Sequence, residues 1–127
     1  MKVLTVVITA VALTGCSSLK DLWPSRWDVN QSKVITDIQQ MSRNFDCKGD
    51  IAKQSKDLAK QVEWLDIYNK TKDTRDIAKI TGLMSSTVNE LADRSSKGSV
   101  SPIYCDIKKK IIVQQADTVA HTIQGRF

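Results

Sequence analysis

The stretch "SPIYCDIKKKIIVQQADTVAHTIQ", residues 101–124, decides between a helical and a mixed fold. Its β-branched run from Ile111 to Val113 is typical of a strand. Apolar residues nevertheless recur at helical spacing along the whole stretch, and Ser101 followed by Pro102 is a strong helix start signal. We therefore predict one long helix with a set of apolar residues facing inward. These are Ile103, Ile107, Ile111, Val119 and Ile123.

Three earlier segments show the same 3.6-residue apolar period. They predict helices from about residue 31 to 45, from 51 to 69 and from 73 to 94, the first two capped by Asn30 and Asp50. Gly82 and the polar run at 85–87 weaken the third segment, so the sequence leaves open whether it is continuous, kinked or split into two short helices. Four amphipathic helices on short loops predict an all-α bundle.

The amino-terminal residues differ in composition from this helical region. Lys2 precedes the apolar run "VLTVVITAVA", which ends in "LTGC" at Leu13 to Cys16 and then turns polar. The run is shorter than the roughly 20 residues of a transmembrane helix and has the length of a signal-peptide core. "LTGC" resembles the lipobox of bacterial lipoproteins. The resemblance implies that Cys16 is diacylated on sulfur, becomes the amino terminus after cleavage, and is then acylated on nitrogen.

The lipobox resemblance also implies a division of the chain and a location. Residues 1–15 are the signal peptide, 16–30 the lipid anchor and tether, and 31–127 a helical domain with room for one core. Ser17 follows the cysteine in place of the aspartate that resembles an inner-membrane retention signal, which implies the periplasmic face of a Gram-negative outer membrane. Trp23 and Trp27 in the tether suit either the lipid headgroups or a lid over the core.

Lipidation of Cys16 leaves Cys47 and Cys105 as a pair in an oxidising compartment. Free thiols and a redox or metal pair are the alternatives. The chain has no CxxC motif, and His121 is its only histidine, so both alternatives have little support. We predict a disulfide between Cys47 and Cys105 that ties the end of the first helix to the start of the last.

The sequence contains few of the residue patterns that catalysis requires. A single histidine, and the absence of HExxH, glycine-rich phosphate loops and multi-cysteine clusters, argue against an enzyme, a cofactor or a metal site. The formal net charge is +5, yet no basic motif interleaved with aromatic residues indicates nucleic-acid binding. A basic surface suits anionic lipid, peptidoglycan or an acidic partner, or is a solvated helix face. We predict binding of a protein without a small-molecule substrate.

The layout resembles the α-helical pilotins of type II secretion, small outer-membrane lipoproteins that carry a secretin to the outer membrane. The shared features are the lipobox, an all-helical domain of this size, and a cysteine after the first helix paired with one in "SPIYC". The resemblance implies an adaptor that takes an amphipathic helix of the secretin into a groove between helices. The groove residues would be Val62, Leu65, Ile80 and Met84.

Other functions fit the same sequence features. A bacteriophage outer spanin would use the tether and helical body to contact an inner-membrane partner during host lysis. A surface-exclusion or receptor-masking lipoprotein would differ only in what it contacts. An envelope lipoprotein with a packed bundle and no specific groove is a further alternative. No residue pattern in the sequence separates these alternatives.

The lipobox prediction is tested by substituting Cys16 with Ser. The variant loses the acyl chains that hold the protein to the membrane, so it should move from the membrane pellet to the soluble periplasmic fraction. Envelope fractionation with immunoblotting measures the change, and Ser18→Ala, which leaves "LTGC" intact, is the control. Continued sedimentation of the Cys16→Ser protein with membranes would contradict the prediction.

Overall fold

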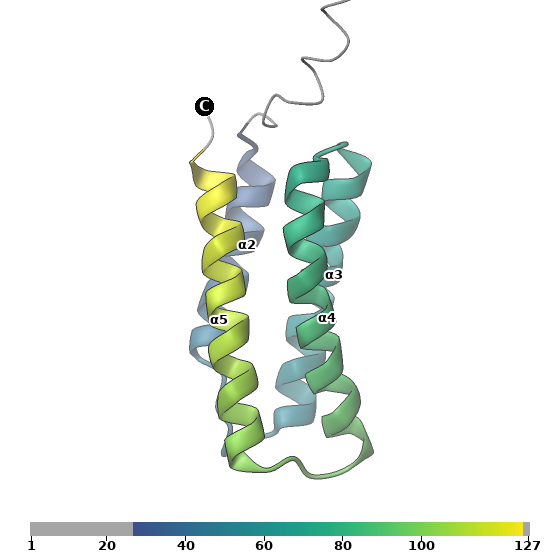
Figure 1. Cartoon of the computed structure of the whole chain (residues 1–127), viewed down its shortest axis with the longest axis vertical. Helices are drawn as coiled ribbons and strands as arrows, with labels where there is room; N and C mark the ends of the chain where they lie inside the picture. The colour runs from purple at the N-terminus through teal and green to yellow at the C-terminus, as the bar shows by residue number, and fades with distance from the viewer. Residues whose placement is uncertain (1–26, 126–127) are drawn as a thin grey trace, which may run out of the picture.

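The computed structural model describes residues 27–125 of the chain (Figure 1). The predicted signal peptide, Cys16 and Trp23 lie outside these residues. Within them the chain forms helices and no strand, which confirms the predicted all-α fold with four helices. The helices are α2 (Val29–Arg43), α3 (Ile51–Thr71), α4 (Arg75–Lys97) and α5 (Pro102–Gln124).

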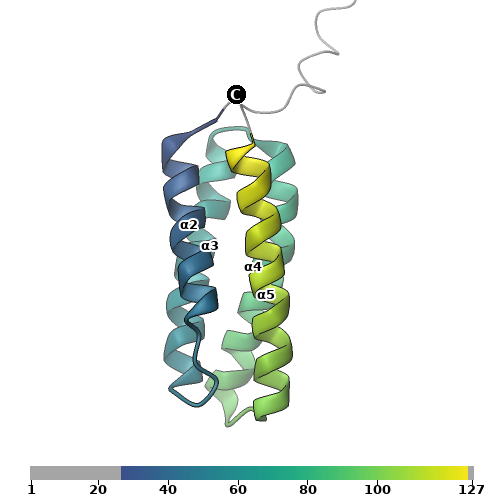
Figure 2. The same ribbon diagram turned by 90° about the vertical axis from the view of Figure 1, so that its left-hand side faces the viewer.

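Successive helices run antiparallel and surround a single core (Figures 1 and 2). Helix α2 packs against α3 and α5, and α4 packs against the same two helices, with the α3–α4 pair the most extensive. The described chain enters and leaves at one end of the bundle, drawn uppermost in Figure 1, which also carries the α3–α4 turn. We call this the upper end. The opposite, lower end carries the loops at 44–50 and 98–101.

The cap residues explain where the helices begin. Asp28, rather than Asn30, caps α2, because its carboxylate accepts hydrogen bonds from the backbone N–H groups of Asn30 and Gln31 at 2.8 and 3.2 Å. Helix α2 therefore begins two residues before the predicted start. Asp50 and Ser101 cap α3 and α5 as predicted.

Helix α4 runs unbroken from Arg75 to Lys97, so it is not split into two short helices near Gly82. A glycine in a helix interior costs only about 1 kcal/mol relative to alanine. Gly82 lies between Thr81 and Met84, which are buried in the bundle, and a Cβ at position 82 would have open space around it. Tertiary packing of the buried stripe on α4 outweighs that local cost.

The buried face of α5 differs from the predicted one. Val119 and Ile123 are buried as predicted, but Ile103 and Ile107 are 73% and 53% exposed, and Ile111 is half-buried. The core instead receives Cys105, Ile112, Ala116, Val119, Ala120 and Ile123. Helical geometry places residues two positions from Cys105 about 160° away from it around the axis. An inward Cys105 therefore turns Ile103 and Ile107 outward.

Cys105 faces inward because it is bonded to Cys47, with the two Cα atoms 5.8 Å apart. This confirms the predicted disulfide. Cys47 lies in the loop after α2, and Cys105 lies in the first turn of α5. The bond therefore fastens the lower ends of the first and last helices.

A buried polar network holds the upper end of the bundle. Gln31 Nε2 donates to Asn69 Oδ1 at 2.8 Å and to Thr74 Oγ1 at 3.1 Å. Asn69 Nδ2 donates in turn to Thr81 Oγ1 at 3.1 Å. All four residues are buried, where unpaired polar groups are costly, and of the groups in this network only Gln31 Oε1 has no hydrogen-bond partner among the described residues. The network joins α2 to α3, α4 and the turn between them.

Asp117 of α5 joins this helix to the carboxyl-terminal end of α2. Arg43 Nη2 donates to both carboxylate oxygens of Asp117, at 2.7 and 2.9 Å, and Gln39 Nε2 donates to one of them at 2.8 Å. The hydrogen bond from Gln39, followed by the hydrogen bond and charge of Arg43, lowers the pKa of Asp117. The carboxylate therefore stays charged, as this contact requires.

Loss of the disulfide should destabilise the domain strongly. Cys47 and Cys105 are 58 positions apart, and closing a loop of that length in the unfolded chain stabilises the fold by about 4 kcal/mol. Urea denaturation followed by circular dichroism should show this loss when a reductant is added. The double variant Cys47→Ala, Cys105→Ala is the control and should not respond to the reductant. An unchanged denaturation midpoint in the reduced wild type would contradict the prediction.

Candidate functional site

The described residues hold no grouping suited to metal binding, and their one histidine is solitary. No cluster of three His, Cys, Asp or Glu side chains between residues 27 and 125 could hold a metal ion. His121 is exposed near the carboxyl end of α5. None of the helices in this range combines the length and hydropathy that a membrane span requires.

The predicted groove residues do not form a groove. Val62, Leu65 and Met84 are at most 1% exposed and belong to the core between α3 and α4. Ile80 is half-buried and packs against that core. The structure brings the four residues together, but as part of the packing that joins the bundle's most extensive helix pair. The prediction that they are open to a partner is wrong, because the core of so small a domain requires them.

The first half of α5 instead carries a second apolar face, at the surface. Ile103, Ile107 and Ile111 are four residues apart, so their side chains lie in a row along one side of the helix. We call this row the α5 ridge. Its exposure falls from 73% at Ile103 to 53% at Ile107, and Ile111 is half-buried. Single exposed apolar residues are ordinary, but a row at helical spacing matches the way one helix docks on another.

The position of Cys105 in the sequence indicates the α5 ridge, although the apolar period of the segment predicted that the same isoleucines face the core. Cys105 stands two residues from both Ile103 and Ile107. A disulfide cysteine must point toward its partner, and residues two positions away on a helix then point away from it. Combining the predicted bridge with helical geometry would have placed both isoleucines on the surface.

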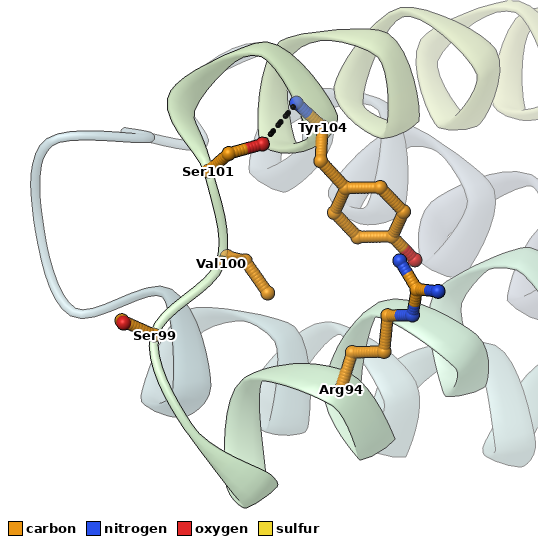
Figure 3. A pocket seen from close by; sticks show the side chains of 5 residues that line it. All are labelled: Arg94, Ser99, Val100, Ser101 and Tyr104. Atoms are coloured by element: carbon orange, nitrogen blue, oxygen red, sulfur yellow. Dashed lines mark hydrogen bonds between the residues drawn. The ribbon is translucent and has the colours of Figure 1, made fainter.

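A charged cluster beside the α5 ridge fastens α5 to α4. Lys108 Nζ lies 2.8 Å from Glu90 Oε2, and the Lys108 side chain is only 17% exposed. The Arg94 guanidinium lies 4.6 Å from the centre of the Tyr104 ring, as Figure 3 shows. The hydrogen bond and the charge of Lys108 lower the pKa of Glu90, with smaller effects from Arg94 and Tyr104. The ion pair is thus intact at neutral pH.

The pocket in Figure 3 opens at the lower end next to this cluster. Its volume is about 270 Å³, and it is lined by Arg94, Ser99, Val100, Ser101 and Tyr104. Arg94 is already placed over Tyr104, and the hydroxyl of Ser101 accepts the backbone N–H of Tyr104 at 3.2 Å. The polar groups of Arg94 and Ser101 are therefore engaged within the protein, and we assign the pocket no ligand.

A second group of exposed apolar side chains lies at the upper end. It consists of Trp27, Val29, Trp64 and Ile67, which are 45% to 61% exposed, and we call it the upper patch. Val29 is the first residue of α2, and Trp27 precedes it. Trp64 and Ile67 lie in the last two turns of α3. The patch therefore lies where the described chain begins.

Tyr68 organises the upper patch. Trp64 stacks on its ring with the ring centres 4.9 Å apart and the planes 10° from parallel. The Tyr68 hydroxyl donates to Asp28 Oδ2 at 3.1 Å and accepts from Asn30 Nδ2 at 3.1 Å. These contacts attach the start of α2 to α3, and they hold the exposed Trp64 ring in a defined position.

Comparisons with protein-family models, with curated proteins and with solved structures find no match.

Removing Lys108 should raise the pKa of Glu90 toward its ordinary value of 4.5. NMR titration of the carboxyl carbon in Lys108→Ala measures the shift, and Lys110→Ala, an exposed lysine on the same helix, is the control. Because the folded-state pKa is lowered, the pair stabilises the protein above pH 4.5 and loses this effect as the pH falls through the lowered value. An equal Glu90 pKa in both variants would show that Lys108 is not the cause.

Proposed function

We propose that this protein is an outer-membrane lipoprotein that acts, without catalysis, as a pilotin-like adaptor for another periplasmic protein. The acyl chains on Cys16 hold it to the periplasmic face of the membrane. The observation that carries the adaptor role is the α5 ridge, where apolar side chains at helical spacing are left outside the core.

The position of the α5 ridge favours a partner in the periplasm. Trp27 lies 11 positions after Cys16, and this stretch spans at most about 40 Å when extended, so the upper end stays near the membrane. Helix α5 has 23 residues and is about 35 Å long, and Ile103 lies in its first turn at the lower end. The α5 ridge, on the first half of this helix, is therefore separated from the upper end by about half of the length of the bundle or more.

The chemistry of the α5 ridge indicates the kind of partner. Three aliphatic side chains four residues apart fit the apolar stripe of an amphipathic helix. Lys110 is exposed on the same turns, which favours acidic residues beside that stripe. The proposed occupant is therefore a partner helix that docks on the outer face of α5. It does not insert between α3 and α4, where the sequence had predicted a groove.

A pull-down tests the proposal. The tagged, lipidated protein is purified from detergent-solubilised envelopes, and a partner should be recovered in stoichiometric amount. Ile107→Glu places a charge in the α5 ridge and should weaken binding at least about tenfold. Leu83→Glu alters a side chain on α4 that is 64% exposed, somewhat more than Ile107 at 53%, and this variant should retain the partner. Circular dichroism establishes that both variants fold.

The identity of the partner separates the adaptor functions. A secretin supports the pilotin-like function, whereas an inner-membrane coiled-coil protein would indicate the spanin function. If nothing copurifies with the wild type, or if both variants lose the partner equally, the α5 ridge is not a docking surface.

A further inference from the structure

Exposed apolar side chains concentrate at the upper end of the bundle. Of the seven large apolar side chains that are exposed among the described residues, four form the upper patch. The core does not use them, and two of them are tryptophans. Their concentration at the end where the chain begins calls for an explanation different from that of the α5 ridge.

The composition of the upper patch suits the boundary between lipid and water. Trp64 and Tyr68 are stacked amphipathic rings, and Lys72 Nζ lies 5.8 Å from the centre of the Tyr68 ring. Tryptophan and tyrosine are favoured at the headgroup level of a bilayer, and lysine stems lie along apolar surface while the ammonium group stays in water. Val29 and Ile67 add aliphatic side chains that gain from leaving water.

The place where the described chain begins determines which surface can reach the upper patch. Trp27 lies 11 positions after the proposed lipid on Cys16, so this end of the bundle stays within about 40 Å of the bilayer. Tethering over so short a span gives an effective concentration on the order of millimolar, so a small patch that binds lipid weakly by itself is sufficient.

We infer that the upper patch docks on the lipid headgroups, so that the anchored domain rests on the bilayer with its lower end directed away. This inference rests on the lipid anchor in the proposed function.

The residues around the upper patch include both acids and bases, such as Asp28, Asp66, Lys70 and Lys72. Docking therefore depends on apolar and aromatic burial, and it does not require anionic lipid. Docking in this orientation presents the α5 ridge to the periplasm.

Quenching of Trp64 fluorescence tests the inference. The double variant Trp23→Phe, Trp27→Phe leaves Trp64 as the only tryptophan. The lipidated protein is reconstituted into phosphatidylcholine vesicles that carry a nitroxide label at the headgroup. Docking places Trp64 at the label, so its fluorescence should fall about twofold, with and without phosphatidylglycerol in the vesicles.

The control moves the reporter to the lower end of the same fold. In this protein all three tryptophans are replaced by Phe and Ile103→Trp is added, and its fluorescence should not be quenched. A further variant, Ile67→Glu in the background with Trp64 alone, should lose most of the quenching, because it introduces a charge into the upper patch.

Vesicle flotation in the same samples separates failure of the anchor from failure of docking. Protein that floats with the vesicles while Trp64 stays unquenched overturns the docking inference and leaves the anchor standing. Equal quenching of Trp64 and of the tryptophan at position 103 also overturns it, since the bundle would then have no preferred orientation. Lipidated protein that fails to float overturns both the anchor and the docking.

Discussion

Cys47 and Cys105 are covalently joined, and this bond sets the rotation of α5 about its own axis. With the Cys105 side chain directed at the loop after α2, the helical repeat carries Ile112, Ala116 and Val119 into the core. The same rotation places the other apolar row of α5 on the outside. The surface that we propose for a partner is thus a consequence of where the disulfide lies.

The two ends of the bundle are held by different chemistry. The lower end has the disulfide and the Glu90–Lys108 ion pair, while the upper end has the buried hydrogen bonds of Gln31 and Asn69. Buried polar groups stabilise a fold only when they are paired, so they favour one alignment of the helices over others. A bundle fixed at both ends can keep one apolar surface near the membrane and hold the other, on the first half of α5, directed away from it.

Prediction of the candidate site from the sequence failed where one residue pattern was compatible with two structural roles. Val62, Leu65 and Met84 have the spacing of an apolar stripe, and such a stripe serves equally as core or as the wall of a groove. They are buried because α3 and α4 pack directly on each other, a contact that the apolar period does not indicate. Likewise, Asp28 and Asn30 are both good cap residues, and the contact of Asp28 with Tyr68 coincides with the earlier start of α2.

By itself the sequence determined the class of fold, because the 3.6-residue apolar period and the caps Asp50 and Ser101 act over a few neighbouring residues. It also determined the pairing of Cys47 with Cys105, once Cys16 is assigned to lipid. Combined with helical geometry, that pairing also indicates which apolar row of α5 is buried. Only the tertiary structure decided that the α3–α4 stripe is closed, because a core and the wall of a groove satisfy the same local period and only contacts between residues distant in sequence distinguish them.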